Sequence, residues 1–129
     1  MLVQKRRVDI PVLAAAVFAW LWAVARAKVQ SVTMDEATTY LAYVHPSAAL
    51  QWYAFPNNHL LNSMLMRMFT LIFGTSHLTV RLPALIGAAI YVGICVYICS
   101  ILPAGFALRF PLFLCLVYNP FVFDFLVAA

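Results

Sequence analysis

The chain has few charged residues. Of its 129 residues, only 9% are charged and 66% are hydrophobic. An ordinary soluble domain is about 25% charged and about 45–50% apolar. This composition is inconsistent with a soluble domain and predicts a membrane protein.

Sequence motifs for several kinds of chemistry are also missing. Eight Lys and Arg against four acids give a formal charge of +4, but the basic residues are scattered and form no run that indicates nucleic-acid binding. The sequence contains no Gly-rich phosphate loop, no G-x-S-x-G and no H-E-x-x-H motif. We therefore expect no nucleic-acid partner. The positions of the charged residues instead help to predict the membrane topology.

Cysteine is scarce and badly placed for a disulfide or a metal. Cys95, Cys99 and Cys115 lie in apolar stretches, are odd in number and form no C-x-x-C pair. This pattern predicts neither a disulfide framework nor a zinc site. We interpret the three residues as small buried hydrophobic side chains.

The C-terminal stretch "FVFDFLVAA" lacks a polar cap, a basic tail and a helix stop signal. Membrane helices normally finish with one of these features. We therefore expect residues 1–129 to be the N-terminal part of a longer membrane protein.

A first membrane span is predicted at residues 10–27. Residues 10–25 are uncharged, and at about 1.5 Å per residue they approach the roughly 30 Å thickness of the hydrocarbon layer. Lys5, Arg6 and Arg7 precede the span, which places the amino end in the cytoplasm by the positive-inside rule. We favour a retained anchor over a cleaved signal peptide, because more membrane sequence follows.

A second span is predicted at residues 82–102. Pro83 is tolerable in the first turn of such a helix, and Gly87 and Gly93 would permit close helix contacts. A third span is predicted at residues 106–123, where prolines interrupt the apolar run.

Residues 28–80 are predicted to form an external loop. Thr33 and Glu36 give the pattern T-x-x-E, a capping box that should open a helix running to about Val44. A second short helix is expected at residues 46–53.

A third helix in this loop, at residues 59–73, decides the topology. It is about 15 residues long and carries Asn62, Ser63 and Arg67, so it is too short and too polar for a comfortable span. We expect it to lie in the membrane interface, with Arg67 reaching toward lipid headgroups.

The predicted fold class is therefore all-α: a polytopic membrane helical bundle of about three spans, with short amphipathic juxtamembrane helices in the first external loop. Two spans then separate Asp35 from Asp124, so both acids should face the same side of the membrane. A crossing by residues 59–73 would place them on opposite sides.

Two adjacent carboxylates, Asp35 and Glu36, stand at the start of the first loop helix. A carboxylate in a first helical turn satisfies free N–H groups and favours the helix dipole, and we assign this role to Glu36. Asp35 is left over from the capping box. Its spacing leaves open both a structural role and a role as general base toward an acceptor.

Three further residues are candidates for binding a substrate. Arg81 precedes the second span on the outer side, where positive charge is disfavoured, and a phosphate-bearing lipid would explain it. Asp124 has no cation nearby in sequence, and it is either a functional acid at membrane depth or a carboxylate in an interfacial loop. His59 stands at a helix start, where a solvated or capping role is the alternative.

The order of these features resembles a known enzyme family. A basic amino end and one span are followed by D-E at an external helix, then N-N-H-L-L, then I-F-G, then V-R-L-P at the next span. This order resembles the polyprenyl-phosphate-sugar-dependent GT-C glycosyltransferases, and within them the dolichyl-phosphate-mannose protein mannosyltransferase and aminoarabinose transferase group. The resemblance covers about Met34 to Leu102, with the first span before it.

The resemblance implies roles for the candidate residues. Asp35 takes the place of the family's general base, and Arg81 matches the family's R-L-P arginine, a candidate contact to the lipid phosphate. His59 matches the histidine of an H-P-P-L-Y-Y-like stretch, although the prolines and tyrosines are replaced here. Glu36, beside Asp35, is a candidate substrate-binding residue, and Asp124 falls where the family has its second external loop.

The resemblance also implies an enzyme of the inner cell membrane. It would transfer a sugar from a polyprenyl-phosphate donor to a lipid, protein or glycan acceptor on the outer face. No cofactor is implied, and the sequence leaves a divalent metal open. A full enzyme of this group needs more spans, so this chain alone is expected to be inactive. The alternative is a non-catalytic small membrane protein, a transporter piece or assembly partner, whose polar residues only cap helices and anchor at headgroups.

Overall fold

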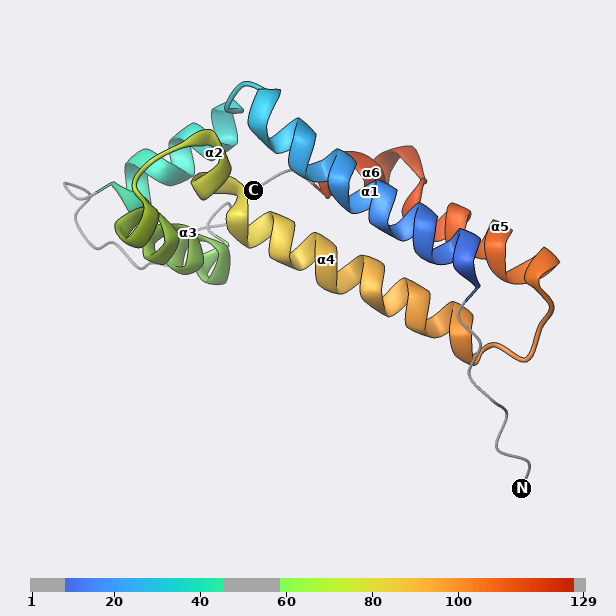
Figure 1. Ribbon diagram of the computed structural model, residues 1–129. Coiled ribbons are helices and arrows are strands. Elements are labelled where there is room, and N and C mark those ends of the chain that lie inside the picture. Colours follow the sequence, from blue (N-terminus) through green and yellow to red (C-terminus); the bar gives the residue numbers. More distant parts are fainter. Residues whose placement is uncertain (1–8, 46–58, 127–129) are drawn as a thin grey trace.

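The computed structural model describes residues 9–45 and 59–126. Every regular element in these two ranges is helical, which confirms the predicted all-α class for the part described (Figure 1). The elements are α1 (Ile10–Val29), α2 (Met34–Thr39), the π-helix η1 (Tyr40–Val44), α3 (Leu60–Phe73), α4 (His77–Ile101), α5 (Phe106–Val117) and α6 (Pro120–Phe125).

Two long apolar helices, α1 and α4, form the body of the molecule. They run antiparallel and side by side, so the end of α1 lies beside the start of α4 (Figure 1). With 20 and 25 residues, both are long and apolar enough to cross a membrane. They correspond to the first and second predicted spans.

Small side chains line the seam between α1 and α4. On α1 the buried residues recur every three or four positions, which places them on one helical face. On α4 the facing positions recur in the same way. Because alanine and cysteine are small, the two backbones can approach closely. The buried seam residues are Val12, Ala16, Ala19, Ala23 and Ala27 on α1, and Leu85, Ala88, Val92, Cys95 and Cys99 on α4.

The close helix contact does not use the glycines that the sequence suggested. Gly87 and Gly93 are exposed on α4, and a Cβ added at either position would meet nothing within 4 Å. The alanines of α1 supply the small surface instead. The buried Cys95 and Cys99 agree with the prediction, whereas Cys115 is exposed on α5.

Helix α4 begins earlier than the predicted residue 82. Ser76 and Thr79 form a capping box, in which the Thr79 N–H donates to Ser76 Oγ at 3.1 Å and the Ser76 N–H donates to Thr79 Oγ1 at 2.7 Å. The cap adds more than one turn before the apolar run. Pro83 therefore lies inside the helix, and Arg81 becomes a helical residue rather than one that precedes the helix.

The predicted third span is not one helix. Residues 106–123 form the 12-residue α5 and most of α6, with a break at Tyr118 and Asn119. Pro120 has no N–H to donate to the Leu116 carbonyl four residues earlier. The Tyr91 hydroxyl of α4 donates to that carbonyl at 2.9 Å instead, which holds the broken segment against the bundle.

A second hydrogen bond holds the break to α1, because the Tyr118 hydroxyl donates to the Ala15 carbonyl at 2.8 Å. Beyond the break, Asn119 caps α6 by accepting from the Phe121 N–H at 3.1 Å. Val122, Phe123 and Leu126 then pack on the α1–α4 seam. Together α5 and α6 return along the two long helices toward the start of α4 (Figure 1).

The loop helices gather at the end where α1 stops and α4 starts (Figure 1). Met66 of α3 is fully buried against Val44 of η1 and Val80 of α4. At about 1.5 Å per residue, the 14 residues of α3 extend about 21 Å, less than the hydrocarbon thickness. The predicted helix at 59–73 and its stop at Gly74 (φ +76°) are thus observed within one residue. The predicted helix at 46–53 lies outside the described residues.

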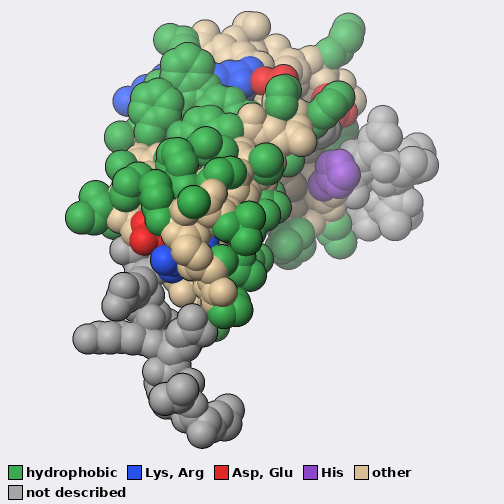
Figure 2. All heavy atoms as spheres, turned by 90° about the vertical axis from the view of Figure 1, so that its right-hand side faces the viewer, with side chains coloured by type: hydrophobic (Ala, Val, Ile, Leu, Met, Phe, Trp, Pro, Cys, Tyr) green, Lys and Arg blue, Asp and Glu red, His purple; other side chains and the backbone are tan. Residues whose placement is uncertain are grey.

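Charged residues of the described part occupy only the two ends of the bundle. At the end where α4 passes into α5, Arg109 Nε lies 3.3 Å from Asp9 Oδ2. Figure 2 looks onto that end and shows hydrophobic side chains over most of the surface in view. The remaining described charges belong to the opposite end, with the loop helices.

The close packing of the seam predicts that position 23 tolerates only a small side chain. Ala23 is 1% exposed, so Ala23→Leu must push α1 and α4 apart and should lower the free energy of unfolding by about 1–3 kcal/mol. Unfolding by SDS titration in mixed micelles measures this change. Ala25→Leu, on the exposed face of the same helix, is the matched control and should be neutral. Equal effects of the two substitutions would contradict the observed seam.

Candidate functional site

The start of α2 has the capping box that the sequence predicts. The Glu36 N–H donates to Thr33 Oγ1 at 3.2 Å, and the Thr33 N–H donates to Glu36 Oε2 at 2.8 Å. Thr33 and Glu36 therefore fix where the chain turns into the helix after leaving α1. The structural role assigned to Glu36 is confirmed.

Glu36 also forms a buried ion pair with Arg81 of α4. Arg81 Nε donates to Glu36 Oε1 at 2.8 Å and Arg81 Nη2 donates to Oε2 at 2.7 Å, a two-pronged contact. Each side chain is only 1% exposed. Charges buried this deeply are stable only when hydrogen bonds replace the lost water.

Three backbone carbonyls complete the surroundings of Arg81. Its Nη1 donates to the carbonyls of Ala27 and Gln30 at 3.1 and 2.9 Å. Its Nη2 donates to the Ser31 carbonyl at 2.9 Å. The last carbonyls of a helix have no partner within it, so Arg81 satisfies the end of α1.

All five N–H groups of the Arg81 guanidinium are therefore occupied. The sequence predicted that Arg81 contacts a lipid phosphate. In this arrangement it has no donor left for one, because its position inside α4 turns it toward Glu36 and the end of α1. The geometry assigns Arg81 a structural task.

Asp35 differs from the other acids. Its side chain is exposed on the first turn of α2, and within residues 9–45 and 59–126 no group forms an ion pair or hydrogen bond with it. Its backbone is held by the capping box and the Arg81 contact of its neighbour Glu36. Asp35 is thus an exposed carboxylate on a fixed helical turn.

Asp124 has a partner that the sequence did not suggest. Its Oδ1 accepts from Arg26 Nη1 at 2.7 Å across 98 residues of sequence, with 73% of the Asp124 side chain exposed. Arg26 directly precedes Ala27, whose carbonyl binds Arg81, so Asp124 and Asp35 belong to the same end of the bundle. That this end faces one side of a membrane stays a prediction.

His59 stands at the N-cap of α3, exposed and with no side-chain cap hydrogen bond. The described contacts bring it to neither Asp35 nor Arg81. Its predicted role in binding a substrate thus stays a prediction. Throughout the ranges that the structure describes, no group of three or more His, Cys, Asp or Glu residues could hold a metal ion.

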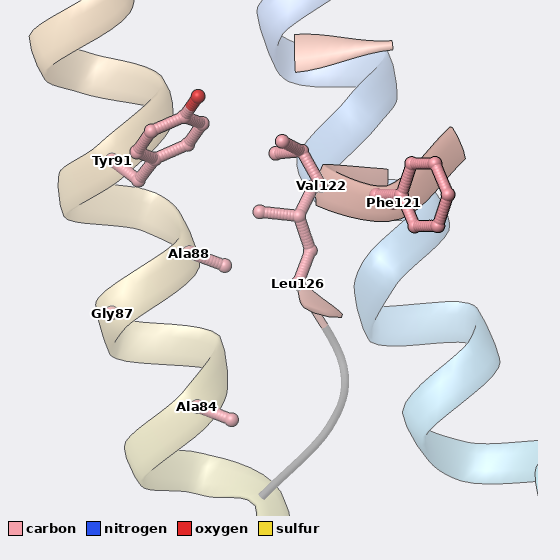
Figure 3. A pocket seen from close by; sticks show the side chains of 7 residues that line it. All are labelled: Ala84, Gly87, Ala88, Tyr91, Phe121, Val122 and Leu126. Atoms are coloured by element: carbon pink, nitrogen blue, oxygen red, sulfur yellow. The ribbon is translucent and has the colours of Figure 1, made fainter. Parts of the chain in front are cut away.

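An apolar groove of about 410 Å³ lies between α4 and α6 (Figure 3). Val122 and Leu126 point toward α4, whereas Phe121 points away from it (Figure 3). None of the lining residues is charged, so the groove itself offers nothing to a phosphate. They are Ala84, Gly87, Ala88, Tyr91, Phe121, Val122 and Leu126.

A second pocket, of about 420 Å³, opens beside α2 and the start of α4. Its volume is within the range of small-molecule sites, about 300–1,000 Å³. It combines apolar walls with hydroxyl and imidazole groups, and it is lined by Val32, Ala37, Tyr40, Leu41, Thr75, Ser76, His77 and Val80. Asp35 is not among these residues, because Ala37 stands about 200° further around the helix.

Sequence reasoning missed the polar residues of this second pocket. Tyr40 and Thr75 are joined by a hydrogen bond of 2.9 Å between their hydroxyls, although 35 residues separate them. The sequence did not single out His77 either. No short motif links these residues, and only the packing of η1 beside α4 brings them together.

No protein-family model, curated protein or solved structure matches this chain. The resemblance to GT-C glycosyltransferases therefore remains a prediction from the order of the sequence motifs.

The geometry predicts that arginine is required at position 81. Arg81→Lys keeps the charge but offers three donors in place of five, so it leaves buried acceptors unsatisfied. We expect the free energy of unfolding in mixed micelles to fall by about 3 kcal/mol or more. Arg26→Lys, at the exposed ion pair with Asp124, should change it by less than about 1 kcal/mol. A loss at Arg26 as large as that at Arg81 would contradict this assignment.

Proposed function

We propose that the chain is the N-terminal part of a membrane glycosyltransferase that uses a polyprenyl-phosphate-linked sugar. Asp35 would be its general base. The observation that supports this best is the contrast among the four acids. Asp9, Glu36 and Asp124 each pair with an arginine, whereas Asp35 is exposed with no partner in the described part.

The proposal includes a topology. In it, α1 and α4 cross the inner membrane, α5 and α6 together form a third, broken crossing, and the amino end is cytoplasmic. The segment from α2 to α3 then lies outside. Two observations support this: α1 and α4 are long and apolar enough to span, and the loop helices gather at one end of the pair.

In the proposed reaction, Asp35 accepts a proton from the hydroxyl or amine of the acceptor. The acceptor atom then forms a bond to the anomeric carbon of the sugar, on the face opposite the leaving group. The bond from that carbon to the phosphate oxygen breaks, and the polyprenyl phosphate leaves with the electron pair. Inversion at the anomeric carbon follows from this geometry.

Rigid placement of Asp35 supports such a role. A general base must stay within hydrogen-bond reach of the proton that it removes. The turn that carries Asp35 is fixed on one side by the capping box and on the other by the Glu36–Arg81 ion pair. These contacts hold the backbone without using the Asp35 carboxylate.

A non-catalytic membrane protein is the second candidate function, and one observation favours it. The polar groups of Arg81, Glu36 and Asp124 are engaged in contacts within the chain, and Asp35 faces neither pocket. An assembly partner would use its polar residues in this way, to tie its helices together at the headgroup level.

Sugar transfer by the complete gene product separates the two candidates. In membranes containing it, Asp35→Asn should lower transfer from a polyprenyl-phosphate sugar by about 10²–10⁴-fold, because the amide cannot accept the proton. Transfer is measured as radiolabelled product. Thr38→Ala alters another exposed polar residue of α2 and is the matched control, with transfer expected to be unchanged. Normal turnover in the Asp35→Asn protein would reject the assigned base.

A further inference from the structure

Arg67 is a cation without a partner in the described part of the chain. Arg26, Arg81 and Arg109 each pair with an acid, and Lys28 is exposed to solvent. Arg67 is half-buried on α3 and forms no ion pair with a described acid. Its Nη1 is shielded from solvent and has no hydrogen-bond partner in the described part.

The position of Arg67 on α3 makes this unusual. Ser63 and Met66 are both 0% exposed, and Thr70 is half-buried. Ser63 and Thr70 lie four and three residues from Arg67, so Arg67 stands at the edge of the packed face of α3.

A shielded N–H of a charged group without an acceptor costs free energy, which a ligand that accepts from it can recover. The planar guanidinium suits an oxyanion with two adjacent oxygens, as in phosphate. Nη1 itself is shielded, but Arg67 as a residue is only half-buried, so part of it is accessible from outside.

The exposed side of α3, which begins beside Arg67, indicates where such an anion would come from. Its large hydrophobic side chains are exposed, and a helix of this kind binds at the boundary between headgroups and acyl chains. These side chains are Leu61, Met64, Met68, Leu71 and Ile72. Met64 and Leu71 lie three and four residues from Arg67, so with that side against lipid Arg67 lies at its border, at the depth of lipid phosphates.

We propose that Arg67 binds the phosphate group of a membrane lipid. The inference deepens the proposed function by placing the phosphate of the donor at Arg67 in place of Arg81. It rests on that function only for the identity of the lipid, because the binding itself requires no sugar transfer.

Binding is measured on the purified chain in dodecyl maltoside micelles, with farnesyl phosphate as probe and tryptophan fluorescence as signal. Arg67→Gln should weaken binding at least about tenfold, since a charged hydrogen bond is lost. Arg67→Lys retains the charge without the planar fork, and its affinity should fall between the two. Lys28→Gln removes another cation of the same end and should leave the affinity unchanged.

Three results would overturn the assignment: unchanged binding in Arg67→Gln, an equal loss in Lys28→Gln, or equal binding of uncharged farnesol. If Arg67→Gln does not fold, the site is tested by comparing the affinities of the Arg67→Lys chain and the unsubstituted chain for farnesyl phosphate. Equal affinities would then overturn the assignment. Inorganic phosphate that competes as strongly as farnesyl phosphate would support the phosphate site but assign it to a free anion.

The Asp35→Asn chain separates this inference from the proposed function. It should bind farnesyl phosphate with unchanged affinity even where the complete gene product carrying that substitution has lost sugar transfer. If the unsubstituted protein binds farnesyl phosphate but transfers no sugar, the phosphate site is supported and the proposed glycosyltransferase function is rejected.

Discussion

The guanidinium of Arg81 joins three segments of the chain. It satisfies the last carbonyls of α1, neutralises the carboxylate that caps α2, and is itself carried by α4. Removing two charges from water is costly, and only a complete set of hydrogen bonds offsets that cost. Because all five donors have acceptors, the contact fixes how the segment that begins with α2 leaves the bundle. The placement of Asp35 depends on it.

Local patterns in the sequence predicted the local structure. Long uncharged runs identified α1 and α4, the T-x-x-E pattern identified the start of α2, and Gly74 marked the end of α3. Each of these signals acts within a few residues. The brevity of α3 led to the prediction that Asp35 and Asp124 face one side of the membrane, and the structure places both acids at one end of the bundle.

Contacts between distant segments could not be predicted in this way. Arg81 and Glu36 are 45 residues apart, and Arg26 and Asp124 are 98 apart, so no spacing rule connects them. Arg81 was predicted to precede the second span because the cap at Ser76, which starts α4 earlier, was missed. Pro120 was recognised as an interruption, but the Tyr91 hydroxyl that accommodates it lies on another helix. In each case the sequence pointed to one residue but could not identify the distant residue that contacts it.

The coupling between Glu36 and Arg81 tests the central claim most directly. Unfolding free energies are measured in mixed micelles for Glu36→Gln, Arg81→Gln and the double variant. If the two side chains form the buried pair, the double variant should be less destabilised than the sum of the single variants, by about 1–3 kcal/mol. Additive losses would show that the residues do not interact, and the account of how Asp35 is positioned would then be wrong.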